Sequence, residues 1–245
     1  MAKRSFSPTL SPDLPGAPAP EGSRTLIERA YGQLRDDIIQ GRLAPGEKLR
    51  VEHLKLRYQV GAGTLREALT RLVSDALVVT EGQRGFHVAP IAIEDLEDLT
   101  ELRVHIEIDA LRQSVRHGDE QWRQRLRQVY ERLRALEQPQ QVQHSREWES
   151  LNTQFHETLI SGHASAWTLK LLRILAQHGE RYRRYSMSLS QSGRDVHQEH
   201  REIFESAMAG NELRAALALE AHIRATPNLI RSALQRGVDV FQPQD

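Results

Sequence analysis

VGAGTLREALTRLVSDAL, residues 60–77, contains the pattern around which the rest of the chain is best interpreted. Apolar residues recur in it with the spacing of one helical face, at Leu65, Ala68, Leu69, Leu72, Val73, Ala76 and Leu77. This spacing predicts an amphipathic helix. Small residues open the helix at 61–63, and Thr64 and Arg66 follow them. The helix is either an ordinary packed helix or one that presents its first turn to a partner, and the flanking sequence must distinguish the two.

The residues before this stretch predict two further helices. A helical stripe runs from Leu26 to Ile39 and ends at Gly41, a typical C-cap residue. The sequence LAPGEKL (43–49) contains a Pro-Gly turn, and residues 51–58 predict a short second helix. Helix, short helix, tight turn and amphipathic helix is the order of a helix-turn-helix unit.

Two short β-rich runs follow the amphipathic helix. Val78–Thr80 and Phe86–Val88 flank EGQRG, whose two glycines suit a turn, and this pattern predicts a hairpin. A hairpin directly after a recognition helix is the wing of a winged helix. Arg84 at the wing tip would face the minor groove or the phosphates of DNA, while Thr64 and Arg66 would approach the major groove.

Composition limits the remaining possibilities. The chain has 33 Lys and Arg against 33 Asp and Glu, divided 13 against 10 in residues 1–90 and 20 against 23 afterwards. The small positive excess in the first part is consistent with a DNA-binding head. The absence of cysteine excludes disulfides and thiolate metal ligands and fits a reducing cytoplasm. No apolar run reaches the length of a membrane span.

The 245 residues divide into three expected segments. Residues 1–23 contain five of the ten prolines and predict a disordered tail. Residues 24–90 form the expected winged helix-turn-helix domain, and residues 91–240 an all-α domain. Helical stripes with Gly and Pro breaks predict six helices in the latter, at roughly 93–117, 119–137, 145–161, 165–189, 193–209 and 211–236. Pro227 should kink or interrupt the last helix.

Histidines within this helical region are spaced as a metal site would require. Asn152 and His156 are four residues apart and share a helix face. His200 and His222 lie ten and twelve residues from the break that begins at Gly210. At a rise of about 1.5 Å per residue, the two imidazoles come level across an antiparallel pair. Three imidazoles and one carboxamide can bind a divalent metal; the alternative is chance, since the chain has 11 histidines.

Residues 25–90 resemble a known family at several motifs. GxLxPGEKL, LREALxRL, LV and RGFxV occur in that order, as in the N-terminal domain of GntR-type bacterial transcription regulators. The resemblance implies DNA contacts by Arg50, Thr64, Arg66 and Arg84. The family usually has Ser/Thr-Arg-Thr where this chain has Gly-Ala-Gly at 61–63. A bidentate Arg–guanine contact is worth about 1–3 kcal/mol, and no arginine stands at 61–63, so the weight of DNA binding shifts to Arg50, Arg66 and the wing.

The second half resembles the all-helical FCD effector domain of the FadR-like branch of this family. The matching motifs are ELRVHIEIDAL (101–111), NTQFHETL (152–159) and EHREIFESAMAGNELRAALALEAHI (199–223). The resemblance places the family's metal ligands on Asn152, His156, His200 and His222. Because the first ligand is often Asp, Asn152 implies weaker metal retention and a stronger attraction for an anionic effector. The expected number of six helices, rather than seven, resembles that of the VanR-like group. The pattern LRxxxLxxRYxVGxGxLREAL resembles CsiR-type repressors of glutarate and aminobutyrate genes.

Together these features predict a mainly α-helical, homodimeric repressor of the bacterial cytoplasm. It would bind a palindromic double-stranded operator through two winged heads, and a small organic acid through a divalent metal, with zinc, nickel or manganese as candidates. Arg103 is the candidate clamp on the acid, and an i, i+4 pair with Glu107 is its alternative role. Two other classes stay open: an effector-independent DNA-binding adaptor, and a metal-dependent enzyme, although no HExxH or comparable motif occurs.

Overall fold

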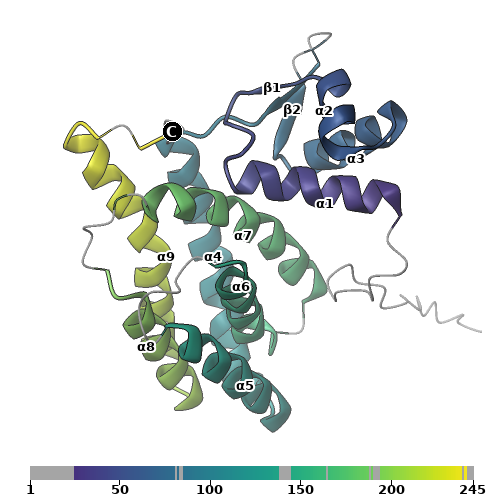
Figure 1. Cartoon of the computed structure of the whole chain (residues 1–245). Helices are drawn as coiled ribbons and strands as arrows, with labels where there is room; N and C mark the ends of the chain where they lie inside the picture. Colours follow the sequence, from purple (N-terminus) through teal and green to yellow (C-terminus); the bar gives the residue numbers. More distant parts are fainter. Residues whose placement is uncertain are drawn as a thin grey trace, which may run out of the picture.

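A computed structural model describes residues 25–80, 82, 85–137, 145–163, 165–187, 189, 194–238 and 240–241. Its elements form a small winged head and a larger bundle of helices (Figure 1). The predicted fold class is therefore confirmed. The tail expected at 1–23 lies outside the described residues.

Three predicted helices build the head: α1 (Leu26–Ile39), α2 (Val51–Tyr58) and α3 (Ala62–Ser74). Thr25 caps α1, because its hydroxyl accepts from the backbone N–H of Glu28 while the Glu28 carboxylate accepts from the N–H of Thr25. The helices pack around a shared core of side chains that are 0% exposed, including Leu34, Leu65, Leu69 and Leu72.

The end of α3 corrects one detail of the predicted apolar face. The helix ends at Ser74, and Ala76 is exposed with a φ of 56°. The backbone N–H of Leu77 then donates to the carbonyl of Leu72 at 3.0 Å, which closes the helix end. Leu77 returns to the core, but Ala76 does not belong to the buried stripe because the left-handed turn points it outward.

A three-stranded antiparallel sheet completes the head. The predicted hairpin is present as β2 (Val78–Thr80) and β3 (Phe86–Val88), with Val79 opposite His87. β1 (Lys48–Leu49) pairs with β3, so the strand order is β1-β3-β2. The sequence did not predict β1, because two residues are too few to show the alternation of a strand.

A buried carboxylate ties α1 to α2. Asp37 accepts hydrogen bonds from Arg42 at 2.6 Å, Arg57 at 2.6 Å and Tyr58 at 2.5 Å. Burial acts to raise the pKa of Asp37, but the hydrogen bonds from Tyr58 and Arg42 and the charge of Arg57 hold it below its ordinary value. The ionised carboxylate thus fixes the two helices that precede α3.

Six helices follow, close to the predicted ranges. They are α4 (Ile93–His117), α5 (Glu120–Glu137), α6 (Arg146–Ile160), α7 (Ala166–Met187), α8 (Val196–Met208) and α9 (Glu212–Gln235). Their core contains large buried side chains such as Trp122, Leu126, Phe155 and Ile203. α9 continues through Pro227 without interruption. Among the described residues, none of the helices has the length and apolar character needed to cross a bilayer.

α4 and α9 lie antiparallel along one side of the bundle (Figure 1). Three ion pairs follow their length, Arg116–Glu212, Arg224–Glu101 and Arg231–Glu97. Each such exposed pair contributes little to the free energy of folding. The order of the pairs along the two helices shows that α4 and α9 run antiparallel.

α7 lies between the bundle and the head (Figure 1). His178 Nε2 is 2.8 Å from the carbonyl oxygen of Asp75, just beyond α3. The buried guanidinium of Arg181 donates to the carbonyl of Ala89, just beyond β3. Each end of the α3–wing segment is therefore bound to the same helix of the bundle.

Candidate metal centre and nucleic-acid interface

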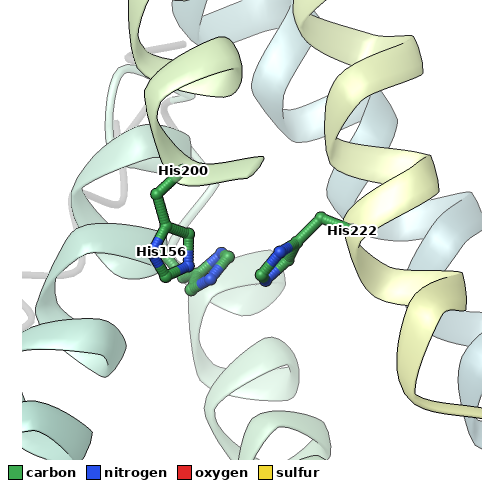
Figure 2. Close-up of side chains that lie close together, drawn as sticks. All are labelled: His156, His200 and His222. Carbon is green, nitrogen blue, oxygen red and sulfur yellow. The ribbon is translucent and has the colours of Figure 1, made fainter. Parts of the chain in front are cut away.

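Three histidines from three helices converge inside the bundle. His156 comes from α6, His200 from α8 and His222 from α9, and their rings point toward one another (Figure 2). One ring nitrogen of each lies within 4.8 Å of those of the other two. The ring centroids are 4.8 Å apart for His200 and His222, 4.9 Å for His156 and His222, and 5.6 Å for His156 and His200. The structure thus brings these predicted site residues together.

Carboxylates orient two of the imidazoles. His200 Nδ1 lies 2.8 Å from Glu137 Oε1, and His222 Nδ1 lies 2.7 Å from Glu199 Oε2. An ionised carboxylate only accepts hydrogen bonds, so each Nδ1 is the donor, and in the neutral form of either imidazole the lone pair lies on Nε2. Metal-binding histidines are held in this way in proteins.

Glu137 is a residue of the candidate site that sequence reasoning missed. It is 1% exposed and also accepts from His197 Nδ1 and Trp148 Nε1, each at 3.1 Å. Burial acts to raise its pKa, but the hydrogen bond and charge of His200 and the bonds from His197 and Trp148 hold the pKa below its ordinary value. Glu137 ends α5 and lies 63 residues from His200, so no local pattern reveals the pair.

Unsatisfied acceptors indicate that the cluster suits a cation. His200 Nε2 and Asn152 Oδ1 are buried and have no hydrogen-bond partner among the described residues. Asn152 is 3% exposed and lies one helical turn before His156 on α6. A buried acceptor without a partner costs about 1–3 kcal/mol. Oxygen and imidazole nitrogen are donors that a divalent cation accepts, so the chemistry of both atoms fits a bound metal.

The imidazoles are also in the correct protonation state for metal binding. Burial lowers the pKa of His156 and His222 well below the ordinary value, and neighbouring imidazole and guanidinium charges act in the same direction. Near neutral pH these two side chains are therefore uncharged, and only a neutral imidazole has a lone pair to donate.

A cavity that opens to solvent adjoins the cluster. His156 and His222 line one part of it. The lining also includes apolar side chains such as Leu96 and Ile223, and three guanidinium groups, from Arg103 on α4, Arg183 on α7 and Arg194 just before α8. Cations beside neutral metal-ligand side chains make this cavity suitable for an anion.

Arg103 forms the i, i+4 pair with Glu107 that the sequence offered as its alternative role, and its side chain also lines the cavity. Its Nε donates to Glu107 Oε1 at 2.6 Å. The guanidinium passes close to α7 at Gly179, where a Cβ would lie only 2.8 Å from Arg103 Nη1. Gly179 therefore leaves the space that Arg103 occupies.

The other two arginines were not predicted. Arg183 Nη2 donates to Glu149 Oε2 at 2.9 Å, and Arg194 forms a bidentate pair with Glu199 at 2.8 and 2.7 Å. Glu199 directly precedes His200 in the sequence, so the Glu-His dipeptide was a usable signal for it. The arginines lie outside the quoted motifs, and their position in the cavity depends on how α7 and α8 pack.

The head presents the predicted DNA-contacting residues at its surface. Arg66 lies in the first half of α3 and Arg50 at the N-cap of α2; both are exposed, and neither guanidinium has a partner among the described residues. Thr64 is half-buried in the first turn of α3, where no acidic residue occurs. That end of the helix can therefore approach phosphate. Arg84 lies outside the described residues.

A winged helix-turn-helix head joined to a helical domain with an enclosed polar site defines a DNA-binding transcription regulator. Residues 26–88 match the bacterial regulatory proteins of the gntR family, and residues 98–225 match the FCD domain. The chain belongs to the GntR family and carries an FCD domain.

Curated relatives agree with this family. The chain is 44% identical over 211 residues to the uncharacterized HTH-type transcriptional regulator BphR of Paraburkholderia xenovorans, covering 85% of this chain and 86% of BphR. It is 28% identical over 211 residues to the HTH-type transcriptional repressor GlaR of Escherichia coli, covering 83% of this chain and 95% of GlaR.

A solved structure shows the same fold. A GntR-type transcriptional regulator from Rhodococcus sp. RHA1 superposes with a TM-score of 0.68 at 24% identity, covering 84% of this chain and 98% of that one. The family and these relatives are transcription regulators rather than enzymes, so the metal-dependent enzyme is set aside.

Proposed function

We propose that this protein is a metal-dependent, acid-responsive repressor of the bacterial cytoplasm. Its helical domain, residues 91–240, binds a small organic acid and thereby controls how residues 24–90 bind a palindromic operator. The observation that supports this function is the histidine cluster beside a cavity lined with arginines. Zinc suits three imidazoles and one oxygen donor, and nickel or manganese are the alternatives.

The proposed ligands are Asn152, His156, His200 and His222. When bound, the metal supplies a Lewis-acidic position that attracts a carboxylate oxygen. Asn152 brings an oxygen donor but no negative charge, so the site keeps more positive charge than an aspartate would leave. The chain's own residues therefore favour an anionic effector.

Arg103 is the proposed clamp on the second carboxylate oxygen. Its guanidinium already forms a charge-assisted hydrogen bond with Glu107 and lines the cavity. A guanidinium has five N–H donors in a fixed plane, so it can hold Glu107 through Nε and an acid through its terminal nitrogens. Arg183 adds a second positive charge to the same cavity.

α7 is the proposed connection between the effector and the head. Gly179 and Arg183 line the cavity, whereas His178 and Arg181 contact the carbonyls beyond α3 and β3. An acid that favours one position of α7 would favour one arrangement of the heads. An acid with equal affinity for both arrangements would shift nothing.

DNA binding is assigned to the exposed surface of the head. We place Thr64 and Arg66 at the major groove, Arg50 at a phosphate and Arg84 in the wing contact. A symmetric pair of heads would read the two halves of an inverted repeat.

The function is tested by selecting operator sequences from random duplexes with the zinc-loaded protein, then measuring affinity by fluorescence anisotropy. We expect an inverted repeat, and we expect at least one acid from a panel of mono- and dicarboxylates to weaken operator binding. Allosteric coupling of typical size predicts a change of about 5- to 150-fold. An operator affinity that no acid alters, with or without zinc, would instead identify the protein as an effector-independent adaptor.

Dimerisation is proposed to use α9. Leu213 and Leu217 lie one turn apart on this helix and are 69% and 59% exposed. We expect the double variant Leu213→Asp, Leu217→Asp to halve the mass measured by light scattering, because two buried charges oppose association. Leu56→Asp on α2, at a position 84% exposed, is the matched control and should stay dimeric. An unchanged mass for the double variant contradicts this interface.

A further inference from the structure

A second cavity adjoins the first and differs from it in lining. It opens to solvent and lies among α4, α6 and α7. Both cavities are lined by Arg103, His156 and Arg183, so these three residues lie where the cavities meet. We call this meeting point the waist. Beyond the waist the first cavity adds Arg194 and His222, and the second adds Arg173.

The second cavity has an aliphatic wall. Its lining includes Ile160 from α6 and Leu169, Leu172 and Ala176 from α7. Leu172 and Ile160 are only 4% and 5% exposed, so these side chains are held in place by the core. A wall of this kind binds hydrocarbon and offers no hydrogen bonds to a polar group.

The charged groups around this second cavity are already neutralised by one another. Arg173 forms a bidentate pair with Glu157 at 2.8 and 3.2 Å, and Arg103 is paired with Glu107. Because Arg173 uses both its Nε and its Nη2 for Glu157, a second carboxylate that bound Arg173 in the same way would have to break this pair and leave Glu157 without its partner. The cavity thus disfavours a dicarboxylate and accepts an apolar group.

From these features, and on the basis of the proposed function, we infer that the effector is a monocarboxylic acid with a hydrocarbon portion. Its carboxylate lies at the waist, within reach of Arg103 and Arg183, and its hydrocarbon portion lies between α6 and α7 against Leu169, Leu172 and Ala176. Each methylene transferred from water to such a wall gains about 0.8 kcal/mol, which corresponds to roughly fourfold in affinity.

Isothermal titration of the zinc-loaded, full-length protein with acetate, propionate, butyrate, pentanoate and hexanoate tests this inference. We expect the affinity to rise by about three- to fourfold for each added methylene until the cavity is full. Succinate and glutarate, whose second carboxylate would enter the aliphatic cavity, should bind more weakly than butyrate and pentanoate.

Ala176→Leu provides the structural test, because the larger side chain fills the cavity on a helix that tolerates leucine. We expect this variant to lose the dependence of affinity on chain length. Ala166→Leu, the same change at the exposed first residue of α7, is the matched control and should keep it. Equal affinities along the acid series, or an unaltered series in Ala176→Leu, contradict the inference while leaving the proposed function intact. If none of the acids binds, acetate included, the proposed function fails and this inference fails with it.

Discussion

His200→Ala is expected to leave the purified protein without bound metal, whereas the parent should hold about one divalent ion per chain. The side chain is 0% exposed, and its Nε2 is buried and lacks a hydrogen-bond partner among the described residues. Loss of a partner that only orients a ligand costs about 10- to 100-fold in metal affinity. Removing the ligand itself should therefore cost more than about 100-fold, as measured by competition with a zinc chelator and by elemental analysis.

Two further variants separate ligand loss from damage to the core. His222 has a side chain that is 10% exposed, so His222→Ala removes a ligand with less disturbance of packing and should also release the metal. Glu137→Gln keeps every proposed ligand but holds the His200 ring less firmly. The metal affinity of this variant should therefore lie between those of the parent and His200→Ala.

Thermal unfolding gives an independent measurement of the same site. Zinc should raise the melting temperature of the parent, because a ligand that binds only the folded state stabilises it, and it should have little effect on His200→Ala. His117→Ala, at an exposed position of α4, is the control and should behave as the parent. If the double variant His156→Ala, His200→Ala retains as much metal as the parent, the proposed metal centre is wrong.

Arg66→Ala is expected to weaken operator binding strongly at physiological salt. Arg66 is exposed near the start of α3, and its guanidinium has no partner among the described residues, so it is available to DNA. A bidentate arginine–guanine contact contributes about 1–3 kcal/mol. A dimer loses two of them, which corresponds to at least about 30-fold in affinity by anisotropy.

Arg71→Ala is the matched control for this measurement. Arg71 lies in the last turn of the same helix and is paired with Glu67 at 3.0 Å, so its removal should change operator affinity little. Arg50→Ala should weaken binding to all sequences alike and reduce the salt dependence, as expected for a phosphate contact. Equal affinities of Arg66→Ala and the parent for the operator would remove α3 from the interface.

Local sequence patterns were sufficient for most of the fold. The stripe of Leu65, Leu69 and Leu72 predicted α3, and six helical stripes predicted α4 to α9, because helical periodicity repeats within a few residues. β1 was not predicted, because it has two residues and forms only by pairing with β3. Ala76 was misplaced because a helix end depends on backbone hydrogen bonds as much as on the apolar pattern.

The candidate site likewise contains residues that the sequence predicted and residues that only the tertiary structure revealed. Histidine spacing and family motifs pointed to Asn152, His156, His200 and His222, since those residues lie on helices whose register follows from the sequence. Glu137, Arg183 and the space at Gly179 became evident only when α5 and α7 were packed against the other helices. Hydrogen bonds and cavities join residues that are dozens of positions apart, and only the packing of side chains brings such residues within a few ångströms of one another.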